Sequence, residues 1–215
     1  HIKRSNWGCD MVIATGDLTQ DNTKESYIHY IKLLESLNTP IYSIPGNHDN
    51  KTIMRSVLKK PLFHYCDELV IHNWLIIGID SSKEHSPSGN ISQRELQRLK
   101  SSIKSTNAEY IMIYLHHQPI NINSRWIDVI GLENKNELYE ILNNNKKIRA
   151  LFFGHIHQSV EMHYGDIQVI GTPSTCRQFK PNSNSFAMDN SPPGYREIQL
   201  NQNGSIDTNV VWLNQ

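Results

Sequence analysis

Residues 41–49, Ile-Tyr-Ser-Ile-Pro-Gly-Asn-His-Asp, join a short apolar strand to a loop whose side chains can bind metal ions. The segment Ile41–Ile44, apolar except for Ser43, predicts a buried strand. A Pro-Gly pair ends the strand, and Asn47, His48 and Asp49 follow at once. Taken alone, such a loop is also explained by Asx-stabilised turn chemistry.

The same combination recurs at the ends of three other predicted strands, Met11–Ala14, Tyr110–Leu115 and Ala150–Phe153. The polar groups that follow these strands are Asp17, the pair His116 and His117, and the pair His155 and His157. Ligands of open α/β sheets bind beyond the carboxyl ends of the strands, so we expect the four groups to meet at one edge. Their recurrence in a chain of 215 residues is hard to attribute to turns alone.

The remaining pattern alternates helices with strands and then ends in a run of strands. Asn22 with Glu25, and Ser92 with Glu95, resemble capping boxes that open helices. Strands alternating with helices favour a layered α/β fold in which two sheets lie between helices. No repeat or linker interrupts residues 1–215, so we expect one domain. The other predicted elements are helices at Thr52–Lys59 and Glu137–Leu142, and strands at Glu68–His72, Trp74–Ile79, Val160–Tyr164, Ile167–Gly171, Tyr195–Leu200 and Asp207–Leu213.

Composition excludes several classes of partner. Lys plus Arg and Asp plus Glu both number 21, so no net positive charge favours nucleic acid or an anionic lipid surface. No apolar run approaches the ~18 residues of a membrane span. The three cysteines form no Cys-x-x-Cys pair, which favours a reducing compartment, and we expect a cytoplasmic protein. The sequence leaves the oligomeric state open.

The start of the chain is polar and does not resemble a secretory leader, because residues 1–10 lack an apolar segment. They are typical of the end of a helix that runs into a strand. We therefore expect the sequence to begin inside a domain.

The ligand types restrict the metal. Asp, Asn and His without thiolates favour Mn²⁺ or Fe²⁺/Fe³⁺, with Zn²⁺ as an alternative. A carboxylate can bridge two ions, and two ions ~3.5–4 Å apart can hold a hydroxide as nucleophile and stabilise a phosphoryl-transfer transition state. The leaving alkoxide then needs a proton. His48 is the candidate general acid, and the neighbouring Asp49 is the candidate group that orients it.

In order and spacing, the segments Gly16-Asp17, Gly46–Asp49, His116 and Gly154–His157 resemble the motifs of the calcineurin-like metallophosphoesterases. The resemblance covers essentially the whole chain. The stretches ATGDLTQD, PGNHD, GHIHQ, GTPSTCRQFKP and PPGYREIQL further resemble the bacterial class III 3′,5′-cyclic AMP phosphodiesterases. This resemblance implies a four-layer αββα sandwich, a dinuclear metal centre, and hydrolysis of cyclic AMP to 5′-AMP by a metal-bridging hydroxide.

The resemblance also implies a role for each motif residue. Asp17 would bridge the two ions, and His157 would belong to the first metal site. The second site would be completed by Asn47, His116 and His155. Of the histidine pair, we expect His116 to be the ligand because it comes first after the strand, with His117 behind it. The nucleotide phosphate would be lined by Asp17, Asn47, His48 and His157, with His48 protonating the leaving group.

One departure from the family pattern leaves alternatives open. The family's first motif, Asp-x-His after the first strand, does not occur before Gly16-Asp17. A strand with its crossover helix takes roughly 30 residues or more, so we expect this unit to be absent from the sequence. The alternatives are a broader phosphodiesterase, acting on glycerophosphodiesters or 2′,3′-cyclic nucleotides, and a non-catalytic nucleotide-binding protein. Around the site, Phe179 and Arg177 could contact the nucleotide and Trp126 could cap the pocket, but ordinary loop roles explain them equally well.

Overall fold

The computed structural model describes residue 2 and residues 8–213, and a six-stranded sheet forms its centre. The strand order is β4-β5-β6-β7-β9-β8, in which β5, β6, β7 and β9 run parallel and the two edge strands run antiparallel to their neighbours. The strands are β4 (Glu68–Ile71), β5 (Trp74–Gly78), β6 (Tyr110–Leu115), β7 (Ile148–Phe153), β8 (Val160–Tyr164) and β9 (Ile167–Gly171). Strands β5 to β7 are almost wholly buried, as their apolar runs predicted.

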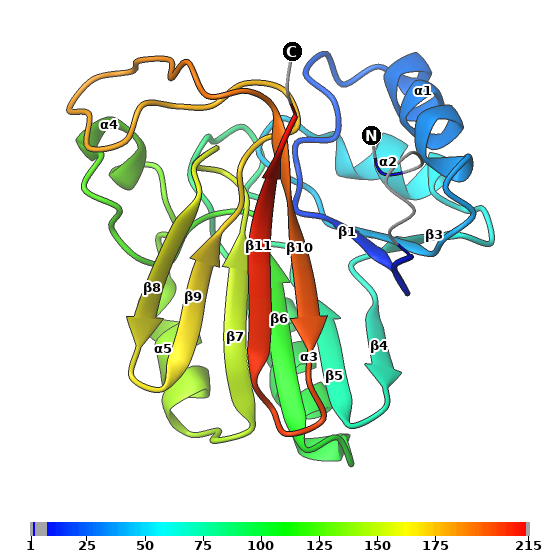
Figure 1. The fold of residues 1–215 in the computed structure, drawn as a ribbon, viewed down its shortest axis with the longest axis vertical. Coiled ribbons are helices and arrows are strands. Elements are labelled where there is room, and N and C mark those ends of the chain that lie inside the picture. Colours follow the sequence, from blue (N-terminus) through cyan, green and yellow to red (C-terminus); the bar gives the residue numbers. More distant parts are fainter. Residues whose placement is uncertain (1, 3–7, 214–215) are drawn as a thin grey trace.

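A second strand layer faces this sheet and consists of two separate sheets within the described residues. One is the parallel sheet β1 (Val12–Ala14), β2 (Ile41–Ser43) and β3 (Phe63–Tyr65), and the other is the hairpin β10 (Gly194–Leu200) and β11 (Ile206–Trp212). Figure 1 shows the hairpin lying across the face of the six-stranded sheet. An apolar cluster with Tyr42, Trp74, Tyr114, Phe152 and Ile206 fills the space between the two layers.

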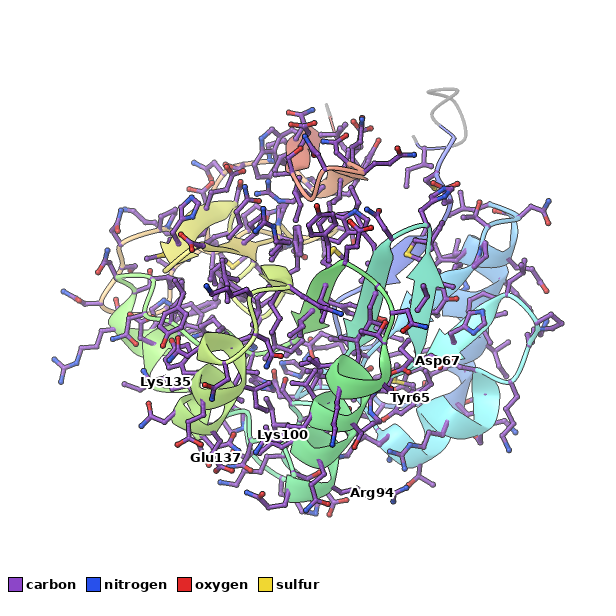
Figure 2. The ribbon with its side chains drawn as sticks, turned by 90° about the horizontal axis from the view of Figure 1, so that it is seen from below. Tyr65, Asp67, Arg94, Lys100, Lys135 and Glu137 are labelled. Atoms are coloured by element: carbon purple, nitrogen blue, oxygen red, sulfur yellow. The ribbon has the colours of Figure 1, made fainter. Side chains whose placement is uncertain are left out.

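Helices cover the two outer faces. Helices α3 (Gln93–Ser105), α4 (Arg125–Asp128) and α5 (Lys135–Asn143) pack on the six-stranded sheet through the largest core cluster. Helices α1 (Lys24–Glu35) and α2 (Lys51–Val57) pack on β1–β3 around a smaller core. In Figure 2, α3 and α5 lie on one side of the sheet with the exposed Arg94 and Lys100, and the hairpin lies on the other. The predicted four-layer αββα sandwich is confirmed.

Most predicted elements form within one or two residues of the expected bounds, and the exceptions have local causes. Helix α3 is capped by Ser92, whose hydroxyl accepts the Glu95 N–H as predicted. Helix α1 is capped instead by Thr23, which accepts the Ser26 N–H, because Asn22 adopts a left-handed backbone with φ of 58°. Strand β3 and helix α4 were not predicted, and both are very short. The expected helix end at the start of the chain falls on residues 1 and 3–7, outside the described residues.

Two further expectations concern the chain as a whole. Cys9, Cys66 and Cys176 are all free, as expected for a chain without a disulfide framework. Among the described residues, no helix has both the length and the apolar character needed to cross a membrane.

Candidate metal centre

The four predicted ligand groups lie on loops that follow neighbouring parallel strands. Strand β1 pairs with β2, and β6 pairs with β7, so each pair of loops leaves its sheet side by side. The loops after β6 and β7 are tied together because the N–H groups of Gly154 and His155 both donate to the His116 carbonyl, at 3.1 and 3.0 Å. Strand order therefore brings the loops together in two pairs, and His116 joins the pairs through its contacts with Thr15 and Asn47.

Two glycines allow the backbones of these loops to approach closely. Gly16 has a φ of 94°, and a Cβ there would lie 2.8 Å from Gly46 N. A Cβ on Gly46 would lie 2.6 Å from Asp17 N. Neither position has room for a methyl group, and Gly16 also needs the left-handed backbone that glycine tolerates best. These two residues bring Asp17 directly against the loop that carries Asn47.

His116 lies at the centre of the site and is almost fully buried. Its Nδ1 donates to the Thr15 carbonyl at 2.7 Å, which leaves the Nε2 lone pair of the neutral ring free. That Nε2 lies 3.3 Å from Asp17 Oδ2, 3.2 Å from Asn47 Oδ1 and 3.1 Å from His155 Nδ1. Two oxygen atoms and a second ring nitrogen thus surround His116 Nε2 within hydrogen-bonding distance.

The charges of the site are strongly coupled. Burial opposes ionisation of Asp17, but the adjacent His116 and the His48 N–H donor at 3.0 Å outweigh it and hold the pKa of this carboxyl below its ordinary value. Burial likewise opposes protonation of His116, yet Asp17 raises the pKa of the imidazole above its ordinary value. Asp17 and His116 therefore each favour the charged form of the other.

Two buried imidazole nitrogens near this point have no hydrogen-bond partner in the described part of the chain. They are Nε2 of His155 and Nε2 of His117. Burial, together with the charge of His116, lowers the pKa of both rings well below the ordinary value, which keeps them neutral. Ligand atoms of His116, His117 and His155 all lie within 4.8 Å of one another. A neutral imidazole carries one lone pair, on Nδ1 or on Nε2. Buried polar nitrogens without a partner are costly, and one lone pair from each ring, beside the Asp17 and Asn47 oxygens, makes a donor set that fits a bound metal ion.

His117, which we expected to lie behind His116, contacts both Ser81 and the ligand group. Its Nδ1 is 2.9 Å from the Ser81 hydroxyl, and its ring lies 4.8 Å from the rings of both His116 and His155. The residue is therefore packed directly against the ligand group. Ser81 follows β5, and its position could not be predicted because it carries no metal-binding signature.

His157 lies at the rim of the group, with a left-handed backbone (φ 47°). Its Nδ1 donates to the Arg177 carbonyl at 3.0 Å, and its ring stacks on Phe179. Burial lowers the pKa of this ring, so the neutral form is favoured and Nε2 keeps its lone pair. The side chain is positioned by the loop after β9, which contacts its carbonyl and its ring.

His48 is half-buried and contacts a residue that sequence reasoning missed. Its Nδ1 lies 3.1 Å from the Gln20 side-chain amide nitrogen. An amide nitrogen only donates, so this contact makes His48 Nδ1 an acceptor and places the proton of the neutral ring on Nε2. The signal that could have indicated Gln20 is its place in the same loop as Asp17.

Asp49 is placed differently from the expected role of orienting His48. Its Oδ2 accepts the N–H groups of Gly46 and Leu18, at 3.0 and 3.1 Å. Its Oδ1 accepts the Tyr27 hydroxyl at 2.9 Å. Asp49 therefore fastens the loop after β2 to the loop after β1 and to α1, while the ring of His48 is contacted by Gln20.

The structure thus brings Asp17, Asn47, His116 and His155 into direct contact, with His48 joined to Asp17 through its N–H. Comparison with known proteins agrees with this geometry. The family model described as calcineurin-like phosphoesterase matches residues 1–159, and the chain belongs to this family.

The chain is 37% identical over 215 residues to "3′,5′-cyclic adenosine monophosphate phosphodiesterase CpdA" from Haemophilus influenzae, covering all of this chain and 78% of that protein. It is 32% identical to the protein of the same name from Escherichia coli K12, covering 94% of this chain and 74% of that one. Among solved structures, a dimetal phosphatase from Danio rerio is similar in fold, with a TM-score of 0.64 at 14% identity over 92% of this chain and 81% of that one.

Proposed function

We propose that this chain is a metal-dependent phosphodiesterase that hydrolyses 3′,5′-cyclic AMP to 5′-AMP. The proposal rests on the Asp17, Asn47 and His155 atoms that surround His116 Nε2. Such a group is stable only when a proton or a bound cation lies among its atoms. The substrate is inferred from relatives named as cyclic AMP phosphodiesterases that are 32–37% identical over nearly the full chain. We further propose that residues 1–215 act as one domain and that the protein works in the cytoplasm.

The ligands that we propose for the second metal site are Asp17, Asn47, His116 and His155, with Asp17 and His157 serving the first. Iron or manganese suits this oxygen and imidazole set, with zinc as the alternative. Ions held here would supply a water activated as nucleophile and positive charge at the phosphoryl oxygens. Thr15 orients the His116 ring by accepting its Nδ1–H, which is the type of support that tunes a metal-binding histidine.

His48 is proposed to deliver a proton to the departing 3′-oxygen. The Gln20 contact places the proton of the neutral ring on Nε2, so the ring can donate from that atom. The Asp17 carboxylate holds the His48 backbone N–H and thereby fixes this loop beside the ligand group. In this proposal Asp49 positions the loop and takes no proton.

His48→Ala should therefore slow hydrolysis of cyclic AMP by about a hundredfold, the size of a typical general-acid contribution. Hydrolysis of a p-nitrophenyl phosphodiester should slow far less, because p-nitrophenolate leaves without a proton. The comparison is kcat for both substrates at saturating metal. His29→Ala, on the exposed side of α1, is the control and should leave both rates unchanged. Equal losses with both substrates would contradict the general-acid role.

A panel of phosphodiesters tests the substrate assignment. We expect kcat/KM for 3′,5′-cyclic AMP to exceed the values for 2′,3′-cyclic AMP and glycerophosphocholine by at least tenfold. Similar values across the panel would favour a broader phosphodiesterase. Nucleotide binding without turnover of any ester, in protein loaded with Mn²⁺ or Fe²⁺, would contradict the proposed activity.

A further inference from the structure

Three aromatic side chains form a cluster where α4 meets the long loop between β9 and β10. Trp126 comes from α4, and Phe179 and Phe186 come from the loop, which passes close to α4 in Figure 1. The ring centroids are 5.1 Å apart for Trp126 and Phe179, 5.2 Å for Trp126 and Phe186, and 5.5 Å for Phe179 and Phe186. All three pairs meet edge to face, the arrangement that aromatic quadrupoles favour.

This aromatic cluster is continuous with the candidate metal centre. The ring of Phe179 stacks on the ring of His157 with centroids 4.3 Å apart and planes 5° from parallel. The Phe179 N–H donates to the His157 carbonyl at 3.2 Å. Phe186 is therefore separated from a proposed metal ligand by one intervening ring.

The loop that carries the two phenylalanines is well fastened. The buried Gln178 side chain accepts the Ser174 N–H and donates to the carbonyls of Ser174 and Pro192. An antiparallel bridge joins Phe179 to Met188, and the Ser183 N–H donates to the Ser124 hydroxyl at 3.4 Å. Despite this support, the Phe186 side chain is 60% exposed. A fixed loop thus holds a large apolar ring in water beside the site.

We propose that Phe186 is the stacking platform for the base of the nucleotide, an inference that rests on the proposed function. Phe179, the ring that the sequence suggested for this role, is already stacked on His157, and Trp126 is partly buried beneath the cluster. Phe186 is the ring of this cluster that is exposed to solvent. A nucleotide whose phosphate lies at the metal centre extends its base away from that centre, and stacking on an aromatic ring is a contact that every base can make.

The kinetic test compares substrates with and without a base. Phe186→Ala should raise KM for cyclic AMP about tenfold, the scale of one base–aromatic stack, and leave kcat within about twofold. Methyl riboside 3′,5′-cyclic phosphate, which has the ring phosphate and no base, should be hydrolysed equally by the variant and the parent. Phe186→Trp should retain the low KM, and Phe186→Leu should lose most of it. Val129→Ala, which removes another exposed apolar group near α4, is the control.

A binding measurement separates failure of this inference from failure of the proposed function. By calorimetry, the parent protein should bind 5′-AMP more tightly than ribose 5-phosphate, and Phe186→Ala should abolish that difference. If the parent hydrolyses other diesters and not cyclic AMP, the proposed function fails. The comparison of 5′-AMP with ribose 5-phosphate still tests whether Phe186 stacks on the base. If the parent hydrolyses cyclic AMP and Phe186→Ala leaves both KM and the 5′-AMP preference unchanged, the platform is refuted.

Discussion

Replacing Asp17 by asparagine is expected to lower kcat/KM for cyclic AMP by about a thousandfold, which corresponds to ~4 kcal/mol of transition-state stabilisation. The two carboxylate oxygens have different partners, since Oδ1 accepts the His48 N–H and Oδ2 faces His116 Nε2. An amide keeps only one acceptor oxygen and removes the negative charge, so it cannot serve both partners and bind a cation. The measurement is steady-state kinetics together with the Mn²⁺ dissociation constant.

Asp166→Asn is the matched control, because this carboxylate lies in the exposed turn between β8 and β9. It should leave both metal affinity and turnover at parent values. Retention of kcat/KM within about tenfold in Asp17→Asn would show that this carboxylate is dispensable, and would contradict its place as the bridging ligand.

Gly46→Ala is expected to destabilise the protein by about 1–3 kcal/mol and to abolish high-affinity metal binding. The added Cβ would lie 2.6 Å from Asp17 N and 2.7 Å from Asp17 Cγ, so the loops after β1 and β2 must separate. The Cβ would meet both the Asp17 carboxylate and the Asp17 backbone nitrogen, and the backbone cannot move aside as the end of a flexible side chain can. Urea denaturation gives the stability change, and calorimetry gives the metal affinity.

Gly8→Ala is the matched control because a Cβ at that position meets no atom of the described residues within 4 Å. Gly8→Ala should change neither the stability nor the metal affinity of the protein. If Gly46→Ala bound metal as tightly as the parent, the close approach of these two loops would have no part in building the site.

Much of the fold could be predicted from the sequence because buried parallel strands are short, apolar and followed at once by polar loops. Strands β6, β8 and β9 have the predicted bounds, and the Ser92 cap locates the start of α3. Strand β3 could not be predicted, because its three residues Phe63–Tyr65 are too few to establish a pattern and its pairing with β2 is non-local. Helix α4 is a single turn of four residues without a side-chain cap.

The candidate site was predictable to the extent that its residues follow strands. Asp17, Asn47, His116 and His155 do so, and they meet. The roles of Gln20, Ser81 and Asp49 depend on how loops from distant strands fold against one another, which no local pattern encodes. Phe186 lies in a long loop rich in Asn and Ser, and its place beside Phe179 depends on the bridge to Met188.

The most direct test of the proposed metal centre is a crystal structure, from crystals grown with Mn²⁺, in which the ion is located by anomalous scattering. We predict an anomalous peak bounded by the Asp17 carboxylate, the Asn47 side-chain oxygen, His116 Nε2 and His155 Nδ1. A well-ordered site without a peak at that point, or a peak only elsewhere on the chain, would contradict it.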